Sequence, residues 1–378
     1  MRTELDQNTR VWLSLKLTPE LGNIAILRLL ECFGSAEAAW AARTSADLDS
    51  VPGLRREAKA ALRAGRTIRP VEKEWRALRE RGWGLICLGD SDYPENLKSI
   101  PDPPAVLYVT SAPELRDLVA VAVVGSRCAS PMGLVFTERL CADLARRGVT
   151  VVSGLALGID SAAHRGAIKG GGRTLAVLGC GLDVMYPRPN VDLRREVMER
   201  GALLTEFQLG TPPLAGHFPQ RNRIISGLAL GVVVVEATAK SGSLITARCA
   251  LEQGREVFAV PGMARNVLSL GPHLLLRQGA TLVETADDIL EQIRPMIRPS
   301  ARPVDVQAAA PPPSSVELSS VEAALLKCLG DEPVHVDRVC RESGLNVSLV
   351  TATLLALELK GLVRQMPGKY FMRLSERV

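Results

Sequence analysis

Phosphate-binding side chains occur in short loops that follow apolar, β-branched segments of the chain. The first loop reads Gly125-Ser126-Arg127 and follows the segment 119–124. Ser130, a residue type that favours helix N-caps, marks the expected start of the next helix. Backbone N–H groups at a helix N-terminus, a hydroxyl and a guanidinium all bind anions. The loop therefore predicts a phosphate site.

A second cluster of candidate residues follows the segment 203–205, at the expected start of another helix. It combines an aromatic ring, two guanidinium groups and an amide, carried by Phe218, Arg221, Asn222 and Arg223. In proteins that bind single-stranded nucleic acid, cationic side chains bind the phosphate backbone, and bases stack on aromatic rings. Only 4% of the residues are aromatic, so backbone electrostatics should dominate and sequence preference should be slight.

A third loop follows the segment 232–235 and contains Lys240 and Ser241. Its small residues allow the backbone to approach a phosphate. Because loops after parallel strands emerge at one edge of a sheet, we expect the cations of the three loops to converge there. The four cations are Arg127, Arg221, Arg223 and Lys240.

Two further loops at this edge contain glycines, in the segments 153–160 and 179–183. Neither contains G-x-G-x-x-G, and the chain has no G-x-x-x-x-G-K-[ST]. A dinucleotide site and a P-loop therefore both lack their motif, and we expect no cofactor.

Several of these residues also have structural explanations. The glycines can serve tight turns, and Asp160 can cap its helix. His164 can be a helix residue whose ring nitrogens simply have hydrogen-bond partners within the fold. Arg223 can form an ion pair with Glu206 or Glu236. The presence of four cationic positions at one edge is what favours an anion site.

The segments that carry these loops alternate between strand and helix. We expect eight strands, at residues 85–88, 105–109, 119–124, 149–152, 175–178, 203–205, 232–235 and 257–260. This alternation predicts a doubly wound α/β domain with a mostly parallel sheet over residues 82–293.

Helical patterns flank the α/β domain on both sides. Residues 1–81 predict a small helical module, in which the turns 18–22 and 50–54 are similar to helix-hairpin-helix units that hold a DNA backbone; a helical cap on the neighbouring domain is the alternative. Residues 294–315 are rich in Pro and Ala and predict a linker. Three helices and two short strands over 316–378 predict a winged helix.

Composition restricts the class of protein. The 378 residues carry a net charge of +5, which favours anionic partners only weakly. No apolar stretch approaches the roughly 20 residues of a membrane span, and the N-terminus does not resemble a secretory signal, so we expect a cytoplasmic protein. The eight cysteines form no C-x-x-C pair, which predicts neither a zinc site nor a disulfide framework.

Five motifs, taken in order along the chain, carry a specific resemblance. The segments 123–127, 152–164, 176–183, 218–227 and 240–247 resemble the DprA family of bacterial DNA-processing proteins, also called Smf. The resemblance implies an extended Rossmann-like domain between a helical SAM-like or helix-hairpin-helix-like module and a winged helix. It also implies a non-enzymatic protein that binds incoming single-stranded DNA in natural transformation, protects it and helps to load the RecA recombinase, with dimerisation through the Rossmann-like domain.

The same resemblance implies DNA contacts at named positions. These are Gly125, Ser126, Arg127, Phe218, Arg221, Asn222, Arg223, Lys240 and Ser241. Arg173 is a further candidate, because the family commonly has a basic residue before the third parallel strand. Leu157 departs from the family pattern, in which many members have Arg, so we do not expect phosphate binding by its loop.

Two other functions compete with this one. A nucleotide-monophosphate phosphoribohydrolase of the lysine-decarboxylase-like type has a similar fold, but its Gly-Gly-x-Gly-Thr-x-x-Glu motif corresponds here to the segment 241–248, with no Glu before Glu252. Hydrolysis would lack its acid/base group. A transcription regulator would read duplex DNA with the winged helix, yet the helix 347–360 offers only Thr351, with Asn346 at its cap, to contact bases.

Overall fold

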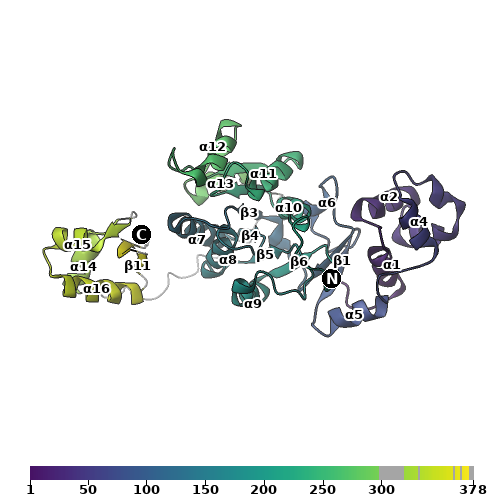
Figure 1. Cartoon of the computed structure of the whole chain (residues 1–378), viewed down its shortest axis with the longest axis horizontal. Coiled ribbons are helices and arrows are strands. Elements are labelled where there is room, and N and C mark those ends of the chain that lie inside the picture. Colours follow the sequence, from purple (N-terminus) through teal and green to yellow (C-terminus); the bar gives the residue numbers. More distant parts are fainter. Residues whose placement is uncertain (298–318, 331–332, 361, 367, 374–378) are drawn as a thin grey trace. The chain divides into compact units, whose positions relative to one another are not determined.

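The computed structural model describes residues 1–297, 319–330, 333–360, 362–366 and 368–373 (Figure 1). These residues form two compact units, one on each side of the segment 298–318. Most of the predicted linker 294–315 lies outside the described residues. Of that linker, Arg294–Met296 form a short 3₁₀ helix.

The larger unit is built on one sheet, in which nine strands are described in the order β1-β2-β6-β5-β4-β3-β7-β8-β9. The strands are β1 (Gly84–Cys87), β2 (Val106–Val109), β3 (Ala120–Val124), β4 (Thr150–Ser153), β5 (Thr174–Val177), β6 (Ala202–Thr205), β7 (Gly231–Val234), β8 (Glu256–Ala259) and β9 (Thr281–Leu282). Neighbours from β6 to β9 are parallel, whereas β2 pairs with both β1 and β6 in antiparallel fashion. The eight predicted strands are confirmed, each starting within one residue of its expected position.

Helices cover both faces of this sheet, as the strand and helix alternation predicts (Figure 1). Successive residues of a strand point to opposite faces, so Val232 and Val234 pack with one helix layer and Val233 with the other. The first layer contains α6 (Glu95–Lys98), α10 (His217–Leu228), α11 (Gly242–Glu252) and α12 (Leu270–Arg277). The second contains α7 (Pro131–Arg146), α8 (Ile159–Lys169), α9 (Val191–Arg200) and α13 (Ala286–Ile293).

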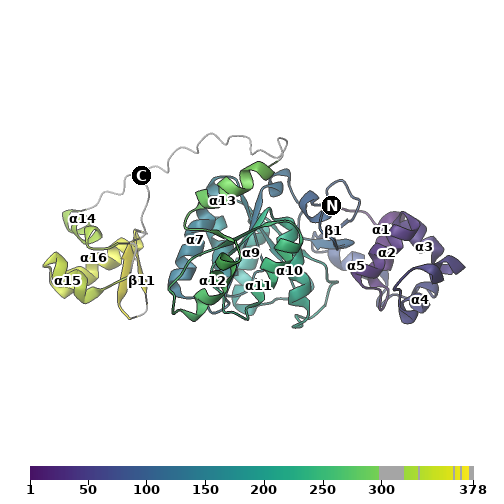
Figure 2. The ribbon, with the colours of Figure 1, turned by 90° about the horizontal axis from the view of Figure 1, so that it is seen from above.

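The N-terminal residues form five α-helices that pack against the β1 end of the sheet, where Figure 2 shows α1 and α5 beside β1. They are α1 (Gln7–Leu17), α2 (Asn23–Phe33), α3 (Ala36–Ala41), α4 (Arg56–Arg63) and α5 (Val71–Arg79). Their core is continuous with that of the sheet, because Trp12, Leu15, Tyr108 and Leu203 belong to one buried cluster. The module therefore also acts as a helical cap on its neighbour, the alternative that the sequence left open.

The smaller unit is a winged helix, as predicted. It contains α14 (Ser320–Lys327), β10 (Val334–His335), α15 (Val336–Ser343), α16 (Val347–Leu359), β11 (Val363–Met366) and β12 (Tyr370–Arg373). Its three described strands are antiparallel in the order β10-β12-β11. A separate core that includes Leu325, Val339, Leu354 and Phe371 holds the unit together.

None of the helices in the described parts of the chain has the length and apolar character needed to cross a membrane.

Candidate nucleic-acid interface

Two adjoining pockets lie at the carboxyl edge of the parallel strands, where the sequence predicts an anion site. The larger pocket has a volume of about 430 Å³ and the smaller one about 150 Å³. Arg127 and Phe218 line both of them. Among the other predicted site residues, Gly125, Ser126, Arg221, Asn222 and Ser241 line the larger pocket.

Glycines hold the first loop close to its neighbours. A Cβ at Gly125 would lie 2.6 Å from Ile159 Cγ1, and a Cβ at Gly158 would overlap the backbone of Ser126 and Arg127. Gly158 also has φ = 76°, a region that other residues rarely adopt. Ile159 N donates to Ser126 O at 3.1 Å, so the start of α8 supports the loop. This close packing leaves the Arg127 side chain directed outwards.

Arg127 is exposed, and its guanidinium carbon lies 5.1 Å from the centroid of the Phe218 ring. The Tyr186 ring is 5.9 Å from that of Phe218, with 47° between their planes. In the described parts of the chain, no hydrogen bond or ion pair engages the Arg127 side chain. A charged group that rests on an aromatic face and has no carboxylate partner is free to bind a phosphate beside a stacked base.

Arg221 lies in the same site but has a structural role. Its guanidinium is buried and donates to the carbonyl oxygens of Gly154, at 2.7 Å, and of Val177. Burial lowers the pKa of Arg221, and the nearby Asp160 carboxylate partly opposes that effect. Its guanidinium carbon is 5.9 Å from the centroid of Phe218. Arg221 therefore ties two loops together beneath the ring and adds positive charge there.

Asp160 holds the second loop. Its carboxylate accepts hydrogen bonds from Gly154 N at 3.1 Å and from Ala156 N at 3.4 Å. Burial raises the pKa of Asp160, while Arg221 acts in the opposite direction. Asp160 therefore does not cap its own helix, whose N-cap residue is Gly158; its carboxylate instead fixes the loop that precedes the helix. Leu157, at the position where many family members have Arg, is 41% exposed beside it.

His164 is a fully buried group on α8. Its Nε2 lies 3.3 Å from Leu155 N, from which it accepts a hydrogen bond, and its Nδ1 lies 2.7 Å from Thr174 Oγ1. Burial, followed by the charge of Arg221, lowers the pKa of His164 to about 3. The imidazole is therefore neutral at physiological pH, and it supports Leu155, whose φ is 55°. His164 therefore has the structural role that the sequence allowed, as a buried helix residue whose two ring nitrogens have hydrogen-bond partners.

The expected convergence is wrong for Arg223. Its Nη2 lies 2.5 Å from Glu206 Oε2, and its Nε lies 3.2 Å from Asp102 Oδ2. Two residues along an α-helix correspond to a rotation of roughly 200°, so Arg221 and Arg223 point to opposite sides of α10. The ion pair with Glu206, named as an alternative from the sequence, is what the structure contains.

Arg173 does not reach the site either. It directly precedes β5 and so lies at the amino edge of the parallel strands. Its buried side chain forms ion pairs with Asp117 at 2.9 Å and with Glu114 at 2.7 Å. A guanidinium held by two carboxylates away from the pockets stabilises the fold and offers nothing to a ligand at the carboxyl edge.

Lys240 and Ser241 lie where α11 begins. Ser241 is the N-cap residue of α11, and its Oγ lies 2.7 Å from Ser243 Oγ. Lys240 is exposed in the preceding loop, next to the larger pocket but not in its wall. The structure therefore places Lys240 at the rim, from which a flexible ammonium can reach a bound strand.

A carboxylate occupies the N-terminus of α7, where the sequence predicts anion binding. Ser130 is the N-cap residue as predicted, but its N–H and its Oγ both donate to Glu236, at 2.8 and 2.6 Å. A Cβ at Gly133 would lie 2.5 Å from Glu236 Cδ, so Gly133 makes room for that side chain. Around this loop, the Arg127 guanidinium consequently remains available to an anion, whereas Ser241 already caps the start of α11 by accepting from Ser243 N.

Comparison with known proteins shows which family the chain belongs to. The model of the family described as DNA recombination-mediator protein A matches residues 84–294, and the DprA winged helix domain matches residues 309–369. Protein Smf of Escherichia coli is 40% identical over 369 residues, which make up 96% of this chain and 95% of that protein. The chain belongs to the DprA (Smf) family. The family resemblance carried by the five motifs is therefore confirmed.

Solved structures of DprA proteins are similar to this one. DprA from Streptococcus pneumoniae superposes with a TM-score of 0.66 and 35% identity over 77% of this chain and 99% of that one. DNA processing protein A from Helicobacter pylori, described for its unique single-stranded DNA binding mode, has a TM-score of 0.51 and 29% identity, over 57% of this chain and 96% of that one. The range matched by the family model, residues 84–294, includes the sheet whose loops form the two pockets.

Proposed function

We propose that this chain binds single-stranded DNA at the pockets of Arg127 and Phe218 and processes incoming DNA in natural transformation. The observation that carries the proposal is an exposed, unpaired guanidinium 5.1 Å from an aromatic ring, in the wall of a pocket at the carboxyl edge of the parallel strands. The family relationship to a single-stranded DNA-binding protein of Helicobacter pylori supports it.

The larger pocket suits a phosphate, and the smaller pocket suits a base. The smaller pocket has walls of glycine backbone and the rings of Tyr186 and Phe218, against which an unpaired base can stack. In the larger pocket, Arg127 presents a guanidinium to a phosphate, and the small residues at the start of α11 let the backbone approach it. Bases of a duplex are stacked inside the helix and cannot enter the small pocket, so single strands should bind more tightly.

We infer a binding protein without hydrolytic activity. The segment 241–248 contains no carboxylate, and Glu252 lies at the far end of α11. The nearby Asp160 and Glu236 are already engaged by backbone N–H groups. The phosphoribohydrolase alternative therefore lacks a free acid/base group in the position where it would be needed.

We further propose that the chain forms a homodimer through its Rossmann-like domain and helps to load the RecA recombinase in the cytoplasm. Exposed apolar side chains on α11, on α12 and between them support self-association; they include Ile245, Leu251, Met263, Val267, Leu270 and Leu274. Analytical ultracentrifugation is expected to give the mass of two chains. A monomer mass at all concentrations would contradict the dimer, and RecA filament growth that does not respond to the protein would contradict the loading role.

Electrophoretic mobility shifts with single-stranded and duplex DNA test the main proposal. We expect Arg127→Glu to weaken single-strand binding by about 1 to 3 kcal/mol, because a cation is replaced by a repulsive charge. The slope of log K against log salt should become shallower by about 0.7 for each phosphate that the variant no longer neutralises. Arg200→Glu, at the exposed C-terminal end of α9 near the opposite edge of the sheet, is the matched control. Equal or tighter binding of duplex, or full affinity in Arg127→Glu, would contradict the proposal.

A further inference from the structure

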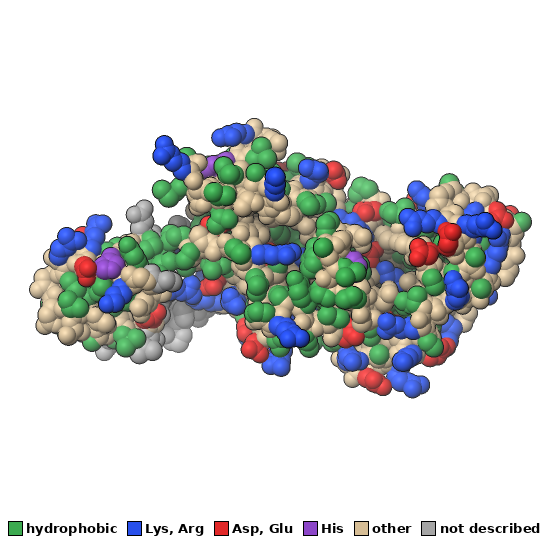
Figure 3. All heavy atoms as spheres, viewed as in Figure 1, with side chains coloured by type: hydrophobic (Ala, Val, Ile, Leu, Met, Phe, Trp, Pro, Cys, Tyr) green, Lys and Arg blue, Asp and Glu red, His purple; other side chains and the backbone are tan. Residues whose placement is uncertain are grey.

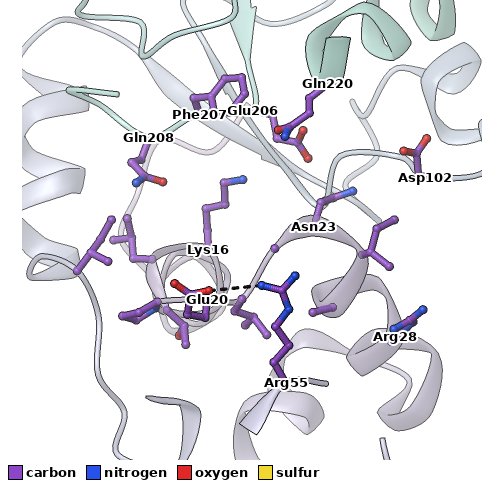
Figure 4. Close-up of a pocket in the computed structure, with 18 of the residues that line it drawn as sticks. Lys16, Glu20, Asn23, Arg28, Arg55, Asp102, Glu206, Phe207, Gln208 and Gln220 are labelled. Atoms are coloured by element: carbon purple, nitrogen blue, oxygen red, sulfur yellow. Dashed lines mark ion pairs between the residues drawn. The ribbon is translucent and has the colours of Figure 1, made fainter. Parts of the chain in front are cut away.

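A separate cavity of about 730 Å³ lies between the N-terminal helices and the sheet (Figure 4). One wall comes from the turn 18–22, the start of α2 and the turn around Gly53. The other wall comes from Asp102, the segment 206–208 and one side of α10. Both turns that are similar to helix-hairpin-helix units thus line the same cavity.

The start of α2 is open to this cavity. Its N-cap residue is Gly22, which has no side chain to accept the first N–H groups of the helix. Glu20 has φ = 62°, which turns the chain sharply before the helix. The side chain of Asn23 instead bridges to the sheet unit, donating to Pro103 O at 3.0 Å and accepting from Ala105 N at 2.8 Å. The backbone N–H groups of this first turn consequently face the cavity with no carboxylate or hydroxyl from the helix cap.

Lys16 supplies an unpaired positive charge in the same place. Figure 4 shows its side chain extending from α1 into the cavity towards the segment 206–208. No ion pair engages Lys16 within the described residues, whereas Arg55 lies 3.7 Å from Glu20, and Arg223 is paired with Glu206. Burial lowers the pKa of Lys16, and the Glu206 carboxylate opposes this only in part. A half-buried ammonium without a counter-ion is a group that an anion would stabilise.

The facing wall offers groups that recognise a nucleobase. Glu206 is 6% exposed, and its Oε1 has no hydrogen-bond partner although it is buried. A buried carboxylate oxygen without a donor is costly, so it points to a ligand that carries an N–H group. The amides of Gln208 and Gln220 lie beside it, and both can donate and accept. Phe207, whose ring stacks on His217 at 4.3 Å, completes the wall.

Charge density alone does not single out this cavity. Figure 3 shows Lys and Arg spread over the surface of the N-terminal helices and mixed with Asp and Glu. What distinguishes the cavity is that an unpaired cation, an uncapped helix N-terminus and an unpartnered carboxylate oxygen meet across one hollow. The first two match a phosphate, and the third matches an amino group on a base.

We propose that this cavity is a second subsite for single-stranded DNA, which holds a phosphodiester at Lys16 and the start of α2 and a base against the wall of Glu206 and Phe207. The proposal rests on the function proposed above. α10 separates the two sites, since Phe218 and Arg221 face the first and Gln220 and Arg223 the second. An α-helix with its side chains is about 10 Å across, so a strand of a few nucleotides can pass over α10 from one site to the other.

Oligonucleotides of two lengths test the subsite on the full chain. Arg55 also lines the cavity, where it adds a second cation beside the start of α2 (Figure 4). We expect Lys16→Met and Arg55→Ala to weaken binding of a strand of about 20 nucleotides by roughly fivefold at low salt, and to make the salt slope shallower by about 0.7 for each phosphate no longer neutralised. A strand of about 2 nucleotides, which is too short to pass over α10 from the first site, should bind each variant like the wild type. Arg56→Ala is the matched control, because Arg56 neighbours Arg55 and is exposed but does not line the cavity. Fluorescence anisotropy gives the affinities, and melting curves confirm that each variant is folded.

Each outcome decides between the two sites. Wild-type affinity of the folded cavity variants for both lengths, with weaker binding in Arg127→Glu, would overturn the subsite and leave the proposed function standing. Full affinity in Arg127→Glu, with weaker binding in Lys16→Met, would overturn the first site and support the cavity as a binding site. An equal decrease in affinity in Arg55→Ala and Arg56→Ala would mean a general charge effect and would overturn the subsite.

Discussion

Arg221 and Arg223 belong to one short motif, yet they serve different parts of the molecule. The first is buried against backbone carbonyl oxygens beneath Phe218, and the second forms ion pairs on the other side of α10. Arg127 is the one arginine of the predicted set that is exposed at the pocket without a carboxylate partner among the described residues. Residue type alone could not separate these roles, because they depend on helix phase and on acidic residues that lie far away in the chain.

His164 makes the stability of the fold depend on pH. Its pKa in the folded state is about 3, below the ordinary value of 6.5. Above pH 6.5 the imidazole is neutral in both states, and its contribution to stability is complete. As the pH falls below 6.5, the unfolded chain binds a proton that the folded chain does not, so the free energy of unfolding decreases. We expect this residue alone to remove about 2 kcal/mol between pH 7 and pH 5.

Thermal unfolding at these two pH values checks the prediction. His164→Gln removes the titrating group, so its melting temperature should fall less between pH 7 and pH 5 than that of the wild type. The variant should also be less stable at pH 7, because it no longer has the well-placed hydrogen bonds to Leu155 and Thr174. Asp160, whose pKa burial raises, is common to both proteins. Equal falls in the two proteins would show that His164 does not carry this effect.

At the scale of elements, the sequence predicts the sheet well because each core strand is a short β-branched run between turn residues. It does not predict β9, since this strand has only two residues and one of them is exposed. β10, another two-residue strand, is missing for the same reason from the winged helix that the sequence predicts with two strands. Strands this short exist because a neighbour offers backbone partners, and a local pattern contains no signal for that.

The start of α7 shows what an element's sequence leaves out. Ser130 predicts the start of this helix correctly, but the anion at that terminus is Glu236, 106 residues away from Ser130. A local motif therefore indicates where N–H groups gather, whereas the topology decides whether they remain free. The cavity at Lys16 has the same origin, because its two walls come from segments that only the packing of the module on the sheet brings together.

At the scale of the whole molecule, the chain divides into its two compact units inside the predicted linker 294–315, and the N-terminal helices belong to the larger unit. The N-terminal helices share a core with the sheet, and Glu74 of α5 accepts a hydrogen bond from Leu209 N at 3.0 Å. The winged helix instead has a core of its own and belongs to a separate unit. The N-terminal helices therefore form one wall of the cavity at Lys16.

The winged helix is expected to contribute little to single-strand binding. The exposed side chains of α16 include Val347, Leu349 and Leu355, which are apolar and offer no hydrogen bonds to bases. Charge reversal at Arg364, in β11, and at Lys369, directly before β12, should therefore leave the affinity for single-stranded DNA within about twofold of the wild type, because the proposed phosphate contacts all belong to the larger unit. Mobility shifts on the full chain, run beside Arg127→Glu, measure this. If the double reversal abolished binding while Arg127→Glu bound normally, the winged helix would be the DNA site and the pockets at the sheet edge would not.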